Sequence, residues 1–176
     1  QLRLELDDFI LDLAGNWECA RTAVLPPLAF WTFYQYHSGG LHDGHTAPFA
    51  GTPIRGVLWY QGESDTEDPS RHAEDLRALV ESFRNDFSDR ELPVLMVQLP
   101  EFGPLSPVCV ESNWARLREE QRKAAESGGV HLAVSLGCGE WHELHPPLKA
   151  KIAERLALLA RRHVYGEKEL MADSPR

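Results

Sequence analysis

The sequence predicts a three-layer α/β fold with a parallel sheet between helices. Three short apolar runs, each too short for a helix, alternate along the chain with three amphipathic segments. This order of strand and helix gives parallel strands joined by right-handed crossovers, here half of a doubly wound sheet. A length of 176 residues, with 43% hydrophobic and 26% charged residues, suits one globular domain with a sizeable core.

The first 53 residues predict less regular structure. Residues 3–24 contain two short alternating apolar runs separated by Asp7 and Asp8, which indicates a hairpin or a sheet edge. Residues 25–53 are rich in proline, glycine, histidine and aromatic residues and show no sustained periodicity. We expect a long structured loop there, with one helical turn near residues 41–49.

The rest of the chain predicts the sheet and its helices. Apolar runs bounded by polar residues suit strands covered on both faces, and we expect them over residues 56–59, 92–100 and 130–137. Apolar residues at helical spacing predict helices over residues 68–87, 111–127 and 145–166. The last helix begins at prolines and is closed by Gly166.

Charge and the length of the apolar runs argue against several classes of protein, whereas the cysteines decide nothing. The net charge is -9 and the basic residues are scattered, which argues against nucleic acid or a membrane surface as a partner. No apolar run approaches the roughly 18 residues of a membrane span, and the acidic N-terminus does not have the pattern of a signal peptide. Cys19, Cys109 and Cys138 have no CxxC spacing and leave the redox compartment open.

Polar residues follow two of the predicted strands. Gln61, Gly62 and Glu63 follow the first, and Glu143 and His145 follow the third. The carboxyl ends of parallel strands meet at one edge of a sheet, so we expect these residues to share a cleft. A histidine beside carboxylates suits a general base, and an amide or a glycine N–H suits an oxyanion. A glycine-rich turn with a surface histidine explains the same residues equally simply.

Two motifs make the pattern specific. Residues 54–65, "IRGVLWYQGESD", and 139–160, "GEWHELHPPLKAKIAERLALLA", resemble the "GVIWYQGESN" and "GEWNDLHPLNK" segments of the sialate O-acetylesterase family, which are SGNH-type carbohydrate esterases. "LDLAGNWE", "LHDGHTAPFAGTPIRG", "LPVLMVQLPEF" and "WARLREEQ" resemble other segments of the family in the same order. The resemblance therefore covers nearly the whole chain.

The resemblance implies roles for the strand-end residues. Gln61 would supply a side-chain oxyanion donor within the Gln-Gly-Glu block that includes Gly62, and His145 would be the general base. Glu143 stands where the family usually has aspartate, and we expect it to orient His145 with support from Glu63. The choice of triad acid between these two glutamates stays open.

The resemblance also implies an SGNH/flavodoxin-like α/β/α fold that is incomplete in this chain. Family members carry the nucleophile in an upstream Gly-Gln-Ser-Asn block, which this sequence lacks. We therefore expect residues 25–176 to be the C-terminal part of the esterase domain, and residues 1–24 the end of an inserted or preceding β segment. The N-terminal part, covalent or a separate subunit, would supply the serine, and the chain alone would be inactive.

The expected activity is serine-hydrolase removal of acetyl groups from sialic acid or other acetylated sugars, without cofactor or metal. The family favours a secreted, periplasmic or lysosomal location. One rival is a non-catalytic carbohydrate-binding or interaction domain derived from such an esterase. A second rival is a metal site of His142, His145 and Glu140 or Glu143, for which the absence of an HExxH motif is unfavourable.

Overall fold

The structure is a computed structural model that describes residues 3–6, 9–12, 16, 37–126 and 128–172. The chain divides into two compact units, Gln1–Ser38 and Gly39–Arg176. In the first unit, β1 (Arg3–Leu6) pairs antiparallel with β2 (Phe9–Asp12), which is the hairpin that the alternating runs predicted. The predicted domain boundary at residue 24 and Cys19 lie outside the described residues.

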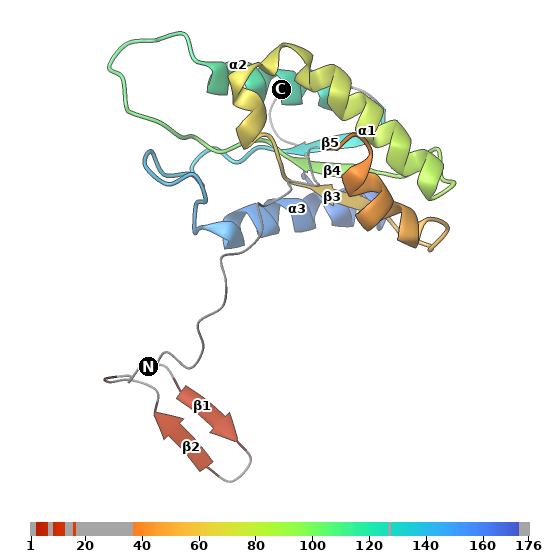
Figure 1. Cartoon of the computed structure of the whole chain (residues 1–176), viewed down its shortest axis with the longest axis horizontal. Helices are drawn as coiled ribbons and strands as arrows, with labels where there is room; N and C mark the ends of the chain where they lie inside the picture. The colour runs from red at the N-terminus through yellow and green to blue at the C-terminus, as the bar shows by residue number, and fades with distance from the viewer. Residues whose placement is uncertain (1–2, 7–8, 13–15, 17–36, 127, 173–176) are drawn as a thin grey trace, which may run out of the picture. The chain divides into compact units, whose positions relative to one another are not determined.

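The second unit is built on a parallel sheet of order β3-β4-β5. Its strands are β3 (Val57–Trp59), β4 (Val94–Val97) and β5 (Val130–Ala133). Helices α1 (His72–Asp86) and α2 (Asn113–Ala125) lie on one face of the sheet, and α3 (Lys149–His163) lies on the other (Figure 1). The predicted three-layer α/β fold with a parallel sheet is confirmed.

The central strand β4 is buried on both faces, as its unbroken apolar run predicted. Val94 and Met96 pack in the core that α1 and α2 cover. Leu95, which points to the opposite face, packs in a cluster with Leu159 of α3. Because successive side chains of a strand point to opposite faces, one four-residue strand serves both cores.

Short helical turns precede the longer helices. The turn predicted near residues 41–49 is present as η2 (His42–Thr46) and η3 (Ala47–Phe49). The helix predicted over residues 68–87 begins at His72, because η4 (Glu63–Glu67) and η5 (Pro69–Arg71) occupy the connection. The last helix likewise begins at Lys149 and not at residue 145, after two prolines that lack the N–H for a continuing ladder.

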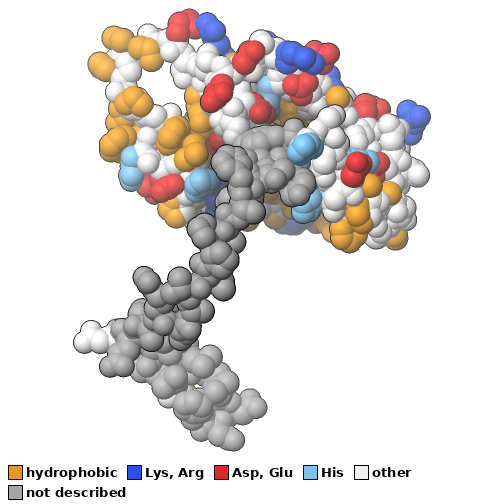
Figure 2. All heavy atoms as spheres, in the orientation of Figure 1, with side chains coloured by type: hydrophobic (Ala, Val, Ile, Leu, Met, Phe, Trp, Pro, Cys, Tyr) orange, Lys and Arg blue, Asp and Glu red, His pale blue; other side chains and the backbone are white. Residues whose placement is uncertain are grey.

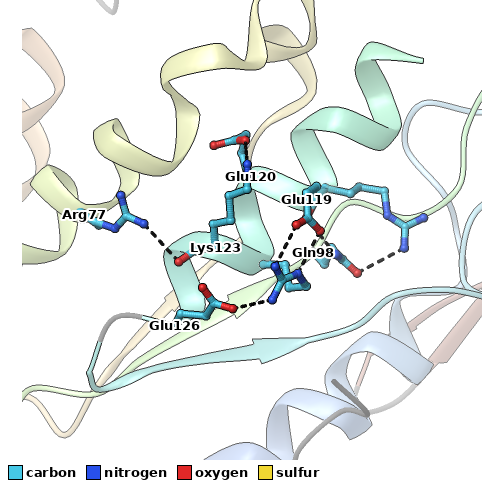
Figure 3. Close-up of polar contacts among 8 residues, drawn as sticks. Arg77, Gln98, Glu119, Glu120, Lys123 and Glu126 are labelled. Carbon is cyan, nitrogen blue, oxygen red and sulfur yellow. Dashed lines mark hydrogen bonds and ion pairs between the residues drawn. The ribbon is translucent and has the colours of Figure 1, made fainter. Parts of the chain in front are cut away.

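Helix α2 is held to its neighbours by polar contacts (Figure 3). Arg77 of α1 donates to the carbonyl oxygen of Lys123 at 3.3 Å. Gln98, just after β4, exchanges hydrogen bonds with Arg118 of α2. On the exposed side, Arg122 pairs with Glu119 and Glu126. These charges are paired along α2 and its C-cap residue Glu126.

Candidate active site

The β3 turn, residues 60–67, leaves β3 through a glycine that cannot be replaced without strain. Gly62 has φ 147°, and a Cβ there would lie 3.0 Å from Leu117 Cδ2 and 3.1 Å from Gln121 Nε2. Only glycine combines this backbone angle with such close packing against α2. This close packing of Gly62 against α2 fixes the position of the turn and so of its neighbours Gln61 and Glu63.

A buried glutamine of α2 joins the β3 turn to the end of β4. Gln121 is fully buried; its Nε2 donates to the Gln61 carbonyl oxygen at 3.1 Å, and its Oε1 accepts from the Leu99 N–H at 2.9 Å. Both backbone groups would otherwise be buried without a partner, which is costly. The Gln61 backbone is therefore held in place by a side chain of α2.

The Gln61 side chain has a partner that the sequence analysis missed. Its Nε2 donates to Asp65 Oδ2 at 2.9 Å, and the same oxygen lies 3.1 Å from Nδ1 of His72. The His72 side chain is only 3% exposed at the start of α1. A histidine on the apolar face of a predicted helix was the one available signal, because it must find a polar partner when buried.

Glu63 opens η4 beside Tyr60. Burial is the main cause that raises the pKa of Tyr60 above its ordinary value, and Glu63 and Cys138 act in the same direction. Glu63 itself is half-buried. Its carbonyl oxygen accepts from the Thr66 hydroxyl at 2.7 Å, which closes the turn.

The β5 loop, residues 134–148, carries the predicted base. Glu143 Oε1 accepts from the backbone N–H of His145 at 2.8 Å, and lies 3.9 Å from the imidazole Nδ1. The His145 side chain is 82% exposed, whereas the next residue, Pro146, is fully buried. Glu143 thus lies beside His145, but its hydrogen bond is made to the backbone and not to the ring.

The β3 turn and the β5 loop meet at the carboxyl edge of the sheet. Tyr60 packs on the buried cluster of Val97, Cys138 and Ile152. Lys149 Nζ lies 4.6 Å from the centre of the Tyr60 ring, which joins the start of α3 to the end of β3. Within the described residues, however, no hydrogen bond or ion pair joins Gln61 or Glu63 to Glu143 or His145.

Two serines of the described residues, Ser64 and Ser135, follow the ends of β3 and β5. Ser135 is buried, and its hydroxyl donates to the carbonyl oxygen of Gln98. Ser64 is exposed in the first turn of η4. No hydrogen bond joins either hydroxyl to His145 in this part of the chain.

Apolar side chains are exposed on the loops that follow β4 and β5. Figure 2 shows hydrophobic side chains gathered on the side of the molecule where the loop between β4 and α2 runs. The Gly103 N–H donates to the Trp141 carbonyl oxygen at 2.9 Å, so the two loops are joined. The exposed apolar residues of these loops are Phe102, Leu105, Val108, Val110, Leu136, Trp141, Leu144 and Leu148. Such a concentration is typical of a binding surface.

The described residues offer little support for the metal alternative. Glu140 Oε2 lies 3.7 Å from His142 Nε2, but the described part of the chain contains no group of three or more histidine, cysteine or acidic residues that could hold a metal ion. Of the described helices, none is both long and apolar enough to span a membrane. The cysteines described, exposed Cys109 and buried Cys138, are both free thiols.

The parallel α/β sheet, with polar residues after β3 and β5 at one edge, is that of the SGNH-type carbohydrate esterases. The family model described as carbohydrate esterase, sialic acid-specific acetylesterase, matches residues 44–160. The chain belongs to this family. The resemblance in the sequence motifs is thereby confirmed.

Individual relatives agree with this assignment. Sialate O-acetylesterase from Homo sapiens is 29% identical over 148 residues, which span 73% of this chain and 28% of the relative. A carbohydrate acetylesterase crystal structure from Xanthomonas citri superposes with a TM-score of 0.61 and 36% identity, over 68% of this chain and 28% of that one. A structure from Arabidopsis thaliana, 22% identical with a TM-score of 0.52 over 74% of this chain and 52% of that one, shows the same fold. The chain thus spans about 28% of the length of the first two relatives.

Proposed function

We propose that this chain supplies the C-terminal half of the active site of a carbohydrate O-acetylesterase. The observation that carries the proposal is the meeting of the β3 turn and the β5 loop at one sheet edge, through Tyr60, Cys138 and Lys149. Both segments contain the motifs that resemble the esterase family. The proposed substrates are acetylated sialic acid or other O-acetylated sugars.

The proposed reaction is acyl transfer through a serine outside this chain. His145 takes the proton of the serine hydroxyl as its oxygen attacks the acetyl carbonyl carbon, and the sugar oxygen leaves with that proton. Water then attacks the acyl carbon with His145 as base, the bond to the serine oxygen breaks, that oxygen takes the proton from His145, and acetate is released. Gln61 Nε2 and the Gly62 N–H donate to the oxyanion of each tetrahedral intermediate.

Glu143 is the proposed acid that orients His145. At 3.9 Å from Nδ1, its carboxylate is close enough to reach the ring after a small side-chain rotation. Catalytic hydrogen bonds are often long without substrate and shorten when it binds. Glu63 is the alternative acid, placed by the rigid β3 turn beside Tyr60.

The edge of the sheet supports a companion segment beside β3. Among the described strands β3 pairs only with β4, and Leu58 is 63% exposed at this edge. The unpaired backbone groups of an edge strand favour pairing with a further strand, and an exposed apolar side chain such as Leu58 favours cover on the face of the sheet. We propose that the N-terminal part of the same enzyme, covalent or as a separate subunit, covers this edge and brings the serine.

The experiment compares the 176-residue chain alone with the chain joined to a segment from a family relative that carries the Gly-Gln-Ser-Asn block. We expect p-nitrophenyl acetate hydrolysis only from the joined protein, and its loss both in His145→Ala and when that serine is replaced by alanine. Release of acetate from O-acetylated sialic acid and from acetylated xylan fragments then distinguishes the substrate classes.

Two outcomes contradict the proposal. Turnover by the chain alone, well above that of its His145→Ala variant, would show that the nucleophile lies within these residues. Binding of an acetylated sugar by the joined protein without any turnover would instead support the non-catalytic alternative, for which the exposed apolar side chains of the β5 loop supply a stacking surface.

A further inference from the structure

One carboxylate oxygen in the β3 turn accepts from two side chains of different elements. Asp65 Oδ2 lies 2.9 Å from Gln61 Nε2 and 3.1 Å from His72 Nδ1. His72 is 3% exposed and Asp65 is 43% exposed, so the histidine is the fixed end of this arrangement. Its helix, α1, is held in the core through buried Ala73 and Leu76.

The geometry assigns a hydrogen to each of the two donors, His72 Nδ1 and Gln61 Nε2. A carboxylate only accepts, so Nδ1 of His72 and Nε2 of Gln61 must both donate to Asp65. The Gln61 amide nitrogen keeps a second N–H that Asp65 does not use. The Asp65 backbone N–H donates to the Gly62 carbonyl oxygen at 3.0 Å, which fixes the carboxylate relative to the turn.

We infer that Asp65, held by buried His72, is a positioning residue that orients the Gln61 side-chain amide for catalysis. This inference rests on the proposed function of Gln61 as an oxyanion donor. The nitrogen and oxygen ends of an amide have nearly the same shape, so packing alone does not choose between them. With the amide turned over, its oxygen would face Asp65 Oδ2 and repel it. Asp65 therefore keeps the nitrogen end in place without contacting the substrate.

The first test uses nitrogen-15 NMR of the 176-residue chain and needs no activity. We expect His72 to carry hydrogen on Nδ1, and one Gln61 side-chain N–H to be shifted downfield and protected from exchange. Asp65→Leu, which keeps the branched shape of the side chain but removes the acceptor, should abolish that protection. Asp65→Asn should retain it, because both donors converge on a single oxygen that an asparagine can also supply.

The second test is a double-mutant cycle in the joined, active esterase. Removing one oxyanion donor costs about a hundredfold to a thousandfold in kcat, so Asp65→Leu should lower kcat by no more than Gln61→Ala does. KM should change little, and Asp65→Asn should restore kcat. If Asp65 acts through Gln61, Asp65→Leu has no further effect on kcat in the Gln61→Ala background.

Either readout can overturn the inference. A His72 ring with its hydrogen on Nε2 and not on Nδ1 would contradict the contact, and this is measured on the unaltered chain. Unchanged Gln61 side-chain signals in Asp65→Leu would contradict it as well. Multiplied losses in the double variant would indicate a separate structural role. A joined protein without esterase activity would contradict the proposed function alone, because the NMR test still measures the contact.

Discussion

The β3 turn and the β5 loop leave the same edge of one sheet, but they are held in different ways. In the β3 turn, buried Gln121 and His72 fix the backbone and the side chain of the candidate oxyanion donor. In the β5 loop, His145 is 82% exposed and its nearest carboxylate binds the backbone. We infer that the oxyanion side of the site is preorganised in this chain, whereas the base depends on what covers the loop.

The largest expected effect is in the β5 loop, where the base is exposed. In the joined esterase, Glu143→Gln should lower kcat by about a hundredfold or more with little change in KM, because the imidazolium loses its partner in the transition state. Glutamine still offers an oxygen to the His145 N–H, so the loop should be kept. Near-normal kcat here, together with a folded but inactive Glu63→Gln, would assign the acid role to Glu63.

The next effect concerns the β3 turn and is tested by replacing Gln121, the buried glutamine of α2 that holds the turn. Gln121→Leu leaves the Leu99 N–H and the Gln61 carbonyl buried without partners, so we expect the free energy of unfolding of the chain to fall by about 3 kcal/mol. Urea denaturation measures this change. The control Arg122→Ala, on the exposed side of the same helix, should cause a clearly smaller loss. Equal losses in both variants would contradict the anchoring role.

Two glycines with positive φ, one in each segment, differ in the space around them. A Cβ at Gly62 would meet α2 side chains, whereas at Gly137 nothing lies within 4 Å; elsewhere in the β5 loop, a Cβ at Gly139 would clash with the Glu101 backbone. We expect Gly62→Ala to cost about 2 to 3 kcal/mol and Gly137→Ala about 1 kcal/mol. Gly44→Ala, at a site with open space and no positive φ, should cause no loss. A larger loss at Gly137 than at Gly62 would reverse the comparison.

The smallest expected effect lies outside both segments. Hydrogen bonds to Asp43 and Asp86 raise the pKa of His42 above its ordinary value. A raised folded pKa contributes stability that is fully present below the unfolded pKa of about 6.5 and is lost as pH rises through the folded pKa. His42→Gln should therefore lower the melting temperature more at pH 5.5 than at pH 8.5. An equal decrease at both values would exclude this linkage.

Sequence patterns predicted the elements better than the side-chain partners. The apolar runs identified β3, β4 and β5, but only β4 is buried at every residue, since Leu58 of β3 is 63% exposed. Two helix starts were misjudged by four residues, where prolines and short turns intervene. The parallel topology places the β3 turn and the β5 loop, which contain Gln61 and His145, after strand ends at one edge of the sheet, but no described contact joins these two residues. The role of Asp65 could not be predicted, since its partner His72 belongs to another element and the two approach only after packing. Whether Glu143 bonds to the His145 ring or to the His145 backbone N–H depends on the rotation of its side chain, which cannot be predicted from the sequence.

The buried contact of Gln121 has a consequence for how the molecule opens. The Leu99 N–H, at the end of β4, is bonded to a helix side chain and not to a neighbouring strand. Its hydrogen can exchange with solvent when α2 moves off the sheet, even while the strands stay paired. The exchange rate of the Leu99 amide therefore measures how often α2 separates from the sheet. Each such opening also breaks the hydrogen bond of Gln121 to the Gln61 carbonyl.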